Sequence, residues 1–242
     1  AEETETGDRD ELLPGVSDRA WRQVSVTAME CLGAQRCPVA EHCFSEQARA
    51  KAAVADLVIT NHAMLAISAF EGLAVLPDYD VVVIDEAHEL QDRVTGAVTG
   101  QLSGTVISAA VTAARKHTSA SVEELAAAGR AFDASVEGLP AGLMPSGLNE
   151  EQQLAVSRVR EAARVALSDS KPEGGDAGDG GRQMARSRLL AVLELCERVL
   201  EAPESGEVLW SSRPSTFSPG EGYSPPDDSA PATLNVAPIS VA

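Results

Sequence analysis

Two short apolar runs without polar interruption constrain the fold of this chain most strongly. Residues 57–60 read Leu-Val-Ile-Thr, and residues 81–84 are three valines followed by an isoleucine. Runs of this kind are typical of strands that are buried on both faces of a parallel sheet. Between them lie an apolar stretch of helical character over residues 63–70 and a loop that contains Pro77. The pattern predicts a strand–helix–strand crossover of an α/β fold.

The chain changes character after Leu90, where long alanine-rich segments of helical period replace the strand signals. The periodicity predicts helices over residues 150–167 and 183–200, separated by a glycine-rich loop. Ser121 followed by Glu124 has the pattern of a capping box at the start of another helix. Aromatic residues make up only 3% of the chain, which suits closely packed helices better than a large β core. We therefore expect more helix than strand.

The strongest chemical signal is the tetrapeptide Asp85-Glu86-Ala87-His88, which directly follows the second apolar run. A strand that ends in this way delivers two carboxylates to the C-terminal edge of a sheet, where open α/β folds bind ligands. There Asp85 would hold a Mg²⁺ ion bound to nucleotide phosphates, and Glu86 would position and polarise the attacking water. In the plainer alternative, the two acidic residues only favour the N-terminal dipole of a solvated helix.

Three of the four cysteines, Cys31, Cys37 and Cys43, lie in one short segment with five residues between successive members. In a reducing compartment such crowding indicates metal ligation before disulfides. Thiolates at this spacing can wrap an iron–sulfur cluster, whose soft iron sites prefer sulfur. Zinc is the competitor, although its paired ligands usually lie about two to four residues apart. His42 would complete a zinc site only beside its neighbour Cys43, so the cysteines alone leave cluster, zinc and unligated thiols open.

The fourth cysteine, Cys196, belongs to a different pattern. It continues a stripe at helical spacing with Leu189, Val192, Leu193 and Val199. Such a stripe is the buried face of a helix, and a free cysteine on that face acts as a small apolar side chain. The spacing predicts a core residue rather than a fourth metal ligand.

The formal net charge of -18 argues, taken alone, against a nucleic-acid-binding module. Phosphate contacts need clustered lysine and arginine. Two local basic patches are exceptions, and each either contacts DNA phosphates or forms an ordinary solvated helix face. The patches are Arg158, Arg160 and Arg164, and separately Arg182, Arg186 and Arg188.

Targeting signals are also informative. No stretch approaches the roughly 20 consecutive apolar residues of a membrane span. The first residues, Ala1-Glu2-Glu3, lack the basic and apolar regions of a signal peptide. We therefore expect a cytoplasmic protein.

The order of the motifs resembles that of the DinG-type, XPD-like superfamily 2 DNA helicases. The resemblance covers nearly the whole chain and is clearest over residues 21–90. The motifs that carry it are, in chain order, the three spaced cysteines followed by Phe44, the pair Ala55-Asp56, the triplet Thr60-Asn61-His62 and the box from Asp85 to His88.

The resemblance implies an ATP-dependent 5′-to-3′ helicase that uses ATP and Mg²⁺ and acts on single-stranded and forked DNA at the nucleoid. It implies that Cys31, Cys37 and Cys43 ligate a [4Fe-4S] cluster, and that His88 couples the nucleotide state to DNA engagement. Asn61 and His62 either belong to the site or are a turn-forming asparagine and a hydrogen-bonded histidine. The alternative function is a non-catalytic iron–sulfur or zinc module that binds DNA or a partner.

The resemblance also divides the chain into four segments. Residues 1–56 would be the C-terminal part of an iron–sulfur domain, and residues 57–97 a RecA-like motor segment. Residues 98–206 would be a helical arch insertion, and residues 207–242 the return to the motor domain, with a strand-and-turn pattern over residues 233–239. The family's upstream cluster cysteine and a G-x-x-x-x-G-K-[ST] phosphate loop do not occur in this sequence. The arginines that a second motor domain supplies to the ATP site are likewise expected outside it.

These departures lead to a first prediction. The isolated chain should show no ATP hydrolysis above background, because a carboxylate pair without a phosphate loop has no means of cradling the nucleotide. A coupled phosphate-release assay on the purified chain, with and without single-stranded DNA, measures this. Robust turnover would contradict the expectation.

Overall fold

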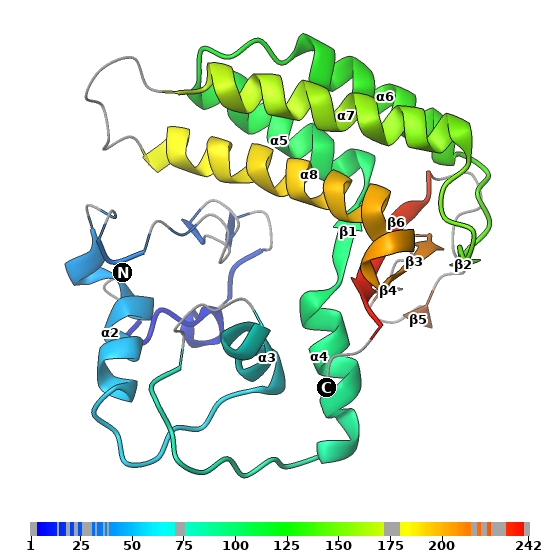
Figure 1. Ribbon diagram of the computed structural model, residues 1–242. Coiled ribbons are helices and arrows are strands. Elements are labelled where there is room, and N and C mark those ends of the chain that lie inside the picture. Colours follow the sequence, from blue (N-terminus) through cyan, green and yellow to red (C-terminus); the bar gives the residue numbers. More distant parts are fainter. Residues whose placement is uncertain are drawn as a thin grey trace. The chain divides into compact units, whose positions relative to one another are not determined.

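The computed structural model describes residues 4–13, 15–17, 20–21, 24–25, 31, 33–35, 37, 39–70, 76–171, 180–213, 217–218, 222–223 and 231–239 (Figure 1). The chain forms two compact units, Ala1–Ala97 and Val98–Ala242. Most of the glycine-rich loop expected after residue 171 lies outside the described residues, which resume at Gly180, where a helix begins.

Four long helices form the body of the second unit. They are α5 (Gly104–His117), α6 (Glu123–Val136), α7 (Glu150–Asp169) and α8 (Gly180–Ser205). Each helix packs against the next along the chain, and α8 closes the arrangement against α5 (Figure 1). This confirms the helices expected over residues 150–167 and 183–200. The fully buried side chains between them include Ile107, Leu125, Phe132, Val156, Val159, Leu189 and Val192.

The helix starts show where a local motif misleads. Helix α7 begins with a complete capping box, in which Asn149 and Gln152 exchange side-chain to backbone hydrogen bonds. The capping box predicted from Ser121 and Glu124 is wrong. Helix α6 starts later, with Val122 as its N-cap and no side-chain capping bond. Ser121 therefore lies one residue too early for its hydroxyl to satisfy the free backbone N–H groups of this helix.

A small antiparallel sheet completes the second unit. Its strands are β1 (Gly100–Leu102), β2 (Gly142–Leu143), β3 (Glu207–Ser212) and β6 (Thr233–Pro238), in the spatial order β1-β6-β3-β2. Strand β6 confirms the strand pattern seen near the end of the sequence. Helix α8 packs on β1, β3 and β6. A separate pair, β4 (Phe217–Ser218) and β5 (Gly222–Tyr223), is also antiparallel.

One arginine ties the sheet to α8. The Arg198 guanidinium donates hydrogen bonds to the carbonyl oxygens of Val98, at 3.3 Å, and Val236, at 3.2 Å. The same group forms an ion pair with Glu207, whose side chain is only 14% exposed. Three chain segments far apart in sequence therefore meet at a single side chain.

The first unit is built from short elements. Over its described residues these are the 3-10 turns η1 (Arg9–Glu11), η3 (Ala40–His42) and η4 (Ala87–Glu89) and the helices α2 (Phe44–Ala52), α3 (His62–Phe70) and α4 (Leu90–Val98). Helix α4 ends at the first residue of the second unit. Helix α3 confirms the helix expected over residues 63–70. In the part of the chain that the structure describes, no helix of either unit is both long and apolar enough to cross a membrane.

Neither apolar run of the first unit forms a strand, so this part of the fold prediction is wrong. Residues 57–60 and 81–84 have no regular secondary structure, and Ile59 and Val83 are each 91% exposed. Every strand pair among the described residues is antiparallel, and no parallel RecA-like sheet is present among them. A strand forms only beside a neighbour that pairs its backbone groups. None of the described segments supplies such a neighbour to these runs.

Cys196 lies in the core, as its stripe predicts. Its side chain is fully buried on α8, and burial raises the pKa of its thiol to about 12, so it stays protonated at neutral pH. Protonation and burial both argue against metal ligation, which requires an accessible thiolate. Cys196 is therefore a packing residue of the second unit.

We expect Cys196→Ser to lower the free energy of unfolding by about 1–3 kcal/mol, because a hydroxyl in an apolar core loses its hydrogen bonds to water. Urea denaturation followed by circular dichroism measures the loss. Cys37→Ser, at a partly exposed position of the first unit, is the control; in the isolated, metal-free chain it should change the stability by about 0.5 kcal/mol or less. Equal unfolding midpoints for both variants would contradict the core assignment.

Candidate functional site

The acidic tetrapeptide forms a tight, exposed turn. Glu86 has φ 48° and ψ 42°, the left-handed region, and it is the one non-glycine residue with positive φ in the described part of the chain. Its backbone N–H donates to the Asp85 Oδ1, at 3.0 Å, and its carbonyl accepts a bond from the N–H of Glu89, at 2.8 Å. Such a conformation costs about 1–3 kcal/mol and is concentrated at functional sites.

His88 faces the carboxylate of Glu86. The distance between His88 Nδ1 and Glu86 Oε2 is 3.4 Å, and both side chains are more than half exposed. The sequence does not predict this contact, because it depends on the backbone conformation of Glu86. Solvent reaches the Glu86 carboxylate, so a water molecule can bind beside it.

The segment that follows the first apolar run reaches this turn. The His62 Nε2 lies 3.0 Å from the backbone oxygen of Asp85, although 23 positions separate the two residues. Asn61 has a different task, because its Oδ1 accepts a hydrogen bond from the N–H of Met64, at 2.8 Å, at the start of α3. Asn61 thus caps the helix, which differs from both the site role and the turn-forming role considered for it. The sequence offers one indication of the His62 contact, because His62 and Asp85 each lie directly or almost directly after an apolar run.

The donor set of this turn suits a magnesium ion bound with nucleotide phosphates. Asp85 and Glu86 are adjacent exposed carboxylates, and Mg²⁺ in such sites takes only one or two carboxylates together with phosphate and water oxygens. Within the described ranges, no three acidic, histidine or cysteine side chains gather into an all-protein metal site. The turn can therefore contribute to a nucleotide site, but it needs phosphate-binding groups from elsewhere.

The cysteines are accessible but are not brought together. Cys31, Cys37 and Cys43 are free and partly exposed. Cys37 closes a turn on Gly33, whose φ is +69°, and Cys43 is the N-cap of α2 without a capping bond from its side chain. His42, the candidate zinc ligand, lies in the preceding turn η3. No metal-binding group of three side chains is found among the residues with described positions.

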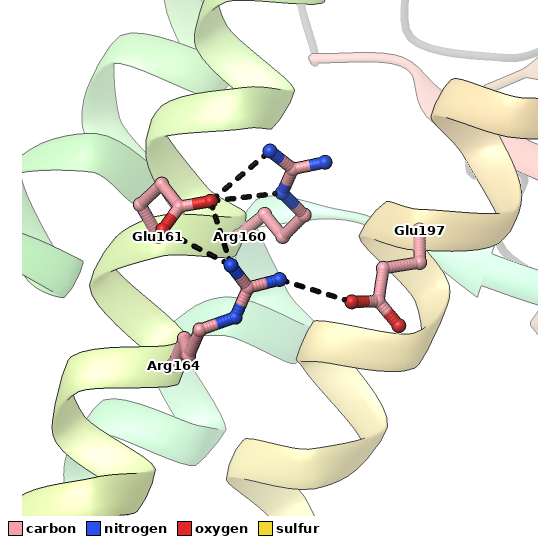
Figure 2. A network of polar contacts seen from close by, with 4 residues as sticks. All are labelled: Arg160, Glu161, Arg164 and Glu197. Atoms are coloured by element: carbon pink, nitrogen blue, oxygen red, sulfur yellow. Dashed lines mark hydrogen bonds and ion pairs between the residues drawn. The ribbon is translucent and has the colours of Figure 1, made fainter.

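The first basic patch is largely neutralised by neighbouring carboxylates. Figure 2 shows Arg160 and Arg164 of α7 around Glu161, with Arg164 also reaching Glu197 on α8. The nitrogen–oxygen distances are 3.0 Å for Arg160 to Glu161 and 3.2 Å for Arg164 to Glu197. Together with Arg158, these residues carry three positive and two negative charges, which favours a solvated helix face over a phosphate-binding surface.

The second patch is also used within the protein. Arg186 donates to the carbonyl of Leu167, at 2.9 Å, and to the hydroxyl of Ser170, at 2.8 Å. These acceptors lie in the last turn and at the C-cap of α7, where a cation satisfies free carbonyls and complements the helix dipole. Arg186 therefore joins the end of α7 to the start of α8.

Comparison with known proteins gives relatives along the whole chain, although no family model matches it. The chain is 37% identical over 248 residues to the ATP-dependent helicase DinG of Mycobacterium tuberculosis, which covers 100% of this chain and 36% of the relative. It is 40% identical over 80 residues to the ATP-dependent DNA helicase YoaA of Escherichia coli, and 37% identical over 98 residues to YoaA of Haemophilus influenzae. The chain thus spans about a third of the length of the DinG relative.

Proposed function

This chain belongs to the DinG-type helicases, because all of its residues fall within the match to DinG. We propose that it works as part of an ATP-dependent DNA helicase. The observation that carries the proposal is the similarity to DinG over the whole of this chain, combined with the exposed acidic turn at Asp85 and Glu86. The resemblance of the motifs adds the finer features: translocation on single-stranded DNA in the 5′-to-3′ direction and unwinding of forked DNA. The protein would act in the cytoplasm, at the nucleoid.

In this proposal the residues of the turn divide the work. Asp85 would hold Mg²⁺ on the nucleotide, and the ion would supply charge neutralisation on the phosphates. Glu86 orients and polarises the attacking water, for which its carboxylate is open to solvent. His88, in contact with Glu86, couples the nucleotide state to DNA. The support for these roles is the adjacency of the carboxylates, their exposure and the strained conformation of Glu86.

The cysteine segment is proposed to bind a [4Fe-4S] cluster through Cys31, Cys37 and Cys43, with a fourth ligand from outside this sequence. The support is the spacing, the motif order and three free, accessible thiols. The four-segment organisation is also a proposal: an iron–sulfur domain over residues 1–56, a motor segment over 57–97, an arch over 98–206 and a return to the motor domain over 207–242.

The roles of the two carboxylates can be separated in the longest natural protein that contains this chain. Glu86→Gln should keep Mg-ATP binding and lose turnover, because an amide cannot polarise the attacking water. A fall in kcat of about 100-fold or more is expected. Asp85→Asn should instead weaken the metal-dependent binding of nucleotide. Steady-state hydrolysis and equilibrium binding of a fluorescent ATP analogue measure the two effects.

Glu89→Gln is the matched control, because Glu89 is a partly exposed carboxylate of the same segment whose partner is Arg93, at 2.9 Å. It should leave both quantities close to those of the unchanged protein. Normal turnover by Glu86→Gln would exclude Glu86 from the water-activating role.

The cluster proposal makes a second prediction for the same protein, purified without oxygen. Cys31→Ser, Cys37→Ser and Cys43→Ser should each lose iron, acid-labile sulfide and unwinding, because serine is a poor ligand for soft iron sites. Cys196→Ser should keep the cluster, because its thiol is buried in the core of the second unit. Iron and sulfide analysis together with the visible absorption spectrum measure the cluster.

Two results would contradict this prediction. Loss of iron from Cys196→Ser as complete as from Cys37→Ser would mean that the fourth ligand is Cys196. Stoichiometric zinc without iron would replace the cluster by a zinc site and favour a non-catalytic binding module.

A further inference from the structure

The peptide group between Asp85 and Glu86 is held at both of its ends. Its carbonyl oxygen lies 3.0 Å from the His62 Nε2, and its N–H donates to the carboxylate of Asp85, also at 3.0 Å. A carbonyl oxygen can only accept, so the His62 Nε2 must carry the proton. Rotation of this peptide plane changes the φ angle of Glu86 directly. The two hydrogen bonds therefore act on the torsion that determines where the Glu86 side chain points.

That torsion is a strained one. Glu86 adopts φ 48° without being glycine, and strain of this kind persists only where surrounding contacts over-determine the conformation. The Asp85 contact is local and comes from a neighbouring residue, so it moves with the turn. The contact from His62 comes from another segment, at the first residue of α3. His62 is thus the anchor through which a separate helix fixes the turn.

The residues around His62 leave its imidazole available to position the turn. Asn61 caps α3 through its own side chain, so the imidazole of His62 is not needed to start the helix. Helix α3 continues to Phe70 and is packed through the buried Ala66, so the backbone that carries His62 is held in place. A solvent-exposed hydrogen bond of this type contributes little to stability. Its effect on geometry matters more.

We infer that His62 is a positioning residue for Glu86: by donating from Nε2 to the Asp85 carbonyl, it holds the Asp85–Glu86 peptide in the orientation that aims the Glu86 carboxylate at the attacking water. This inference rests on the proposed function of Glu86. Misplacement of a catalytic group by about 1 Å can cost about 100-fold in rate. Loss of the His62 contact should therefore lower kcat and leave nucleotide binding almost unchanged.

The test uses the longest natural protein that contains this chain, with three variants. His62→Ala removes the donor, His62→Gln offers an amide N–H in a similar place, and His117→Ala is the matched control at a histidine of the second unit. Each variant is first checked for folding by thermal unfolding. ATP hydrolysis is then measured with and without saturating single-stranded DNA, and KM for ATP is determined.

The expected result is a fall in kcat of about tenfold or more for His62→Ala with KM within about twofold, the same with and without DNA. His62→Gln should recover most of the lost rate, and His117→Ala should match the unchanged protein. The inference is overturned if a folded His62→Ala keeps its kcat, if only KM rises, or if His62→Gln is as slow as His62→Ala. A loss confined to reactions that contain DNA would make His62 a DNA contact instead.

Failure of the inference is distinguishable from failure of the proposed function. If Glu86→Gln hydrolyses ATP normally, the role of Glu86 is wrong and His62 has nothing to position. If Glu86→Gln is inactive while His62→Ala is fully active, the function stands and the positioning role falls. If His62→Ala fails to fold, the inference still requires that His62→Gln folds and retains most of the kcat. A folded His62→Gln with a strongly reduced kcat would then overturn it.

Discussion

The apolar stripe of α8 is the contact on which the second unit depends. Leu189, Val192, Cys196 and Val199 are at most 1% exposed, and their helix packs against α5, α7 and three strands of the small sheet. Full burial of a side chain such as leucine or valine contributes about 1.5–3 kcal/mol. An exposed ion pair such as that of Arg164 and Glu197 contributes about 0–1 kcal/mol. The buried stripe therefore contributes most of the stability of helix packing in this unit, and the charge network on its surface adds little to that stability.

Sequence reasoning succeeded where the signal is local and periodic. The stripe that contains Cys196, the helices α3, α7 and α8 and the strand β6 could all be predicted, because each depends on side-chain spacing along one element. The parallel sheet could not, because residues 57–60 and 81–84 need pairing partners that spacing cannot guarantee. The capping box at Ser121 failed for a related reason: the motif gives the right chemistry but does not determine the residue at which a helix begins.

The candidate site shows the same division. Asp85 and Glu86 could be selected from their adjacency and from their place after an apolar run, and their chemical roles stay predictions. The strain at Glu86 and its contact with His88 depend on backbone torsions, which composition and spacing do not reveal. The cysteines illustrate the opposite case. Their spacing indicates a shared metal centre, whereas no group of three metal-binding side chains is found among the described residues, so the shared centre stays a prediction.

The Arg198 contacts have a mechanical consequence. Strands β1 and β6 are antiparallel, with Gly100 opposite Val236, so the chain segments that lead into and out of the second unit leave the same end of this strand pair. Tension applied between those two segments would peel the pair open one hydrogen bond after another instead of shearing all of them together. Arg198 bonds to the Val98 and Val236 carbonyls at that end. It is therefore among the first contacts to bear the pull, and its ion pair with Glu207 spreads the load into β3.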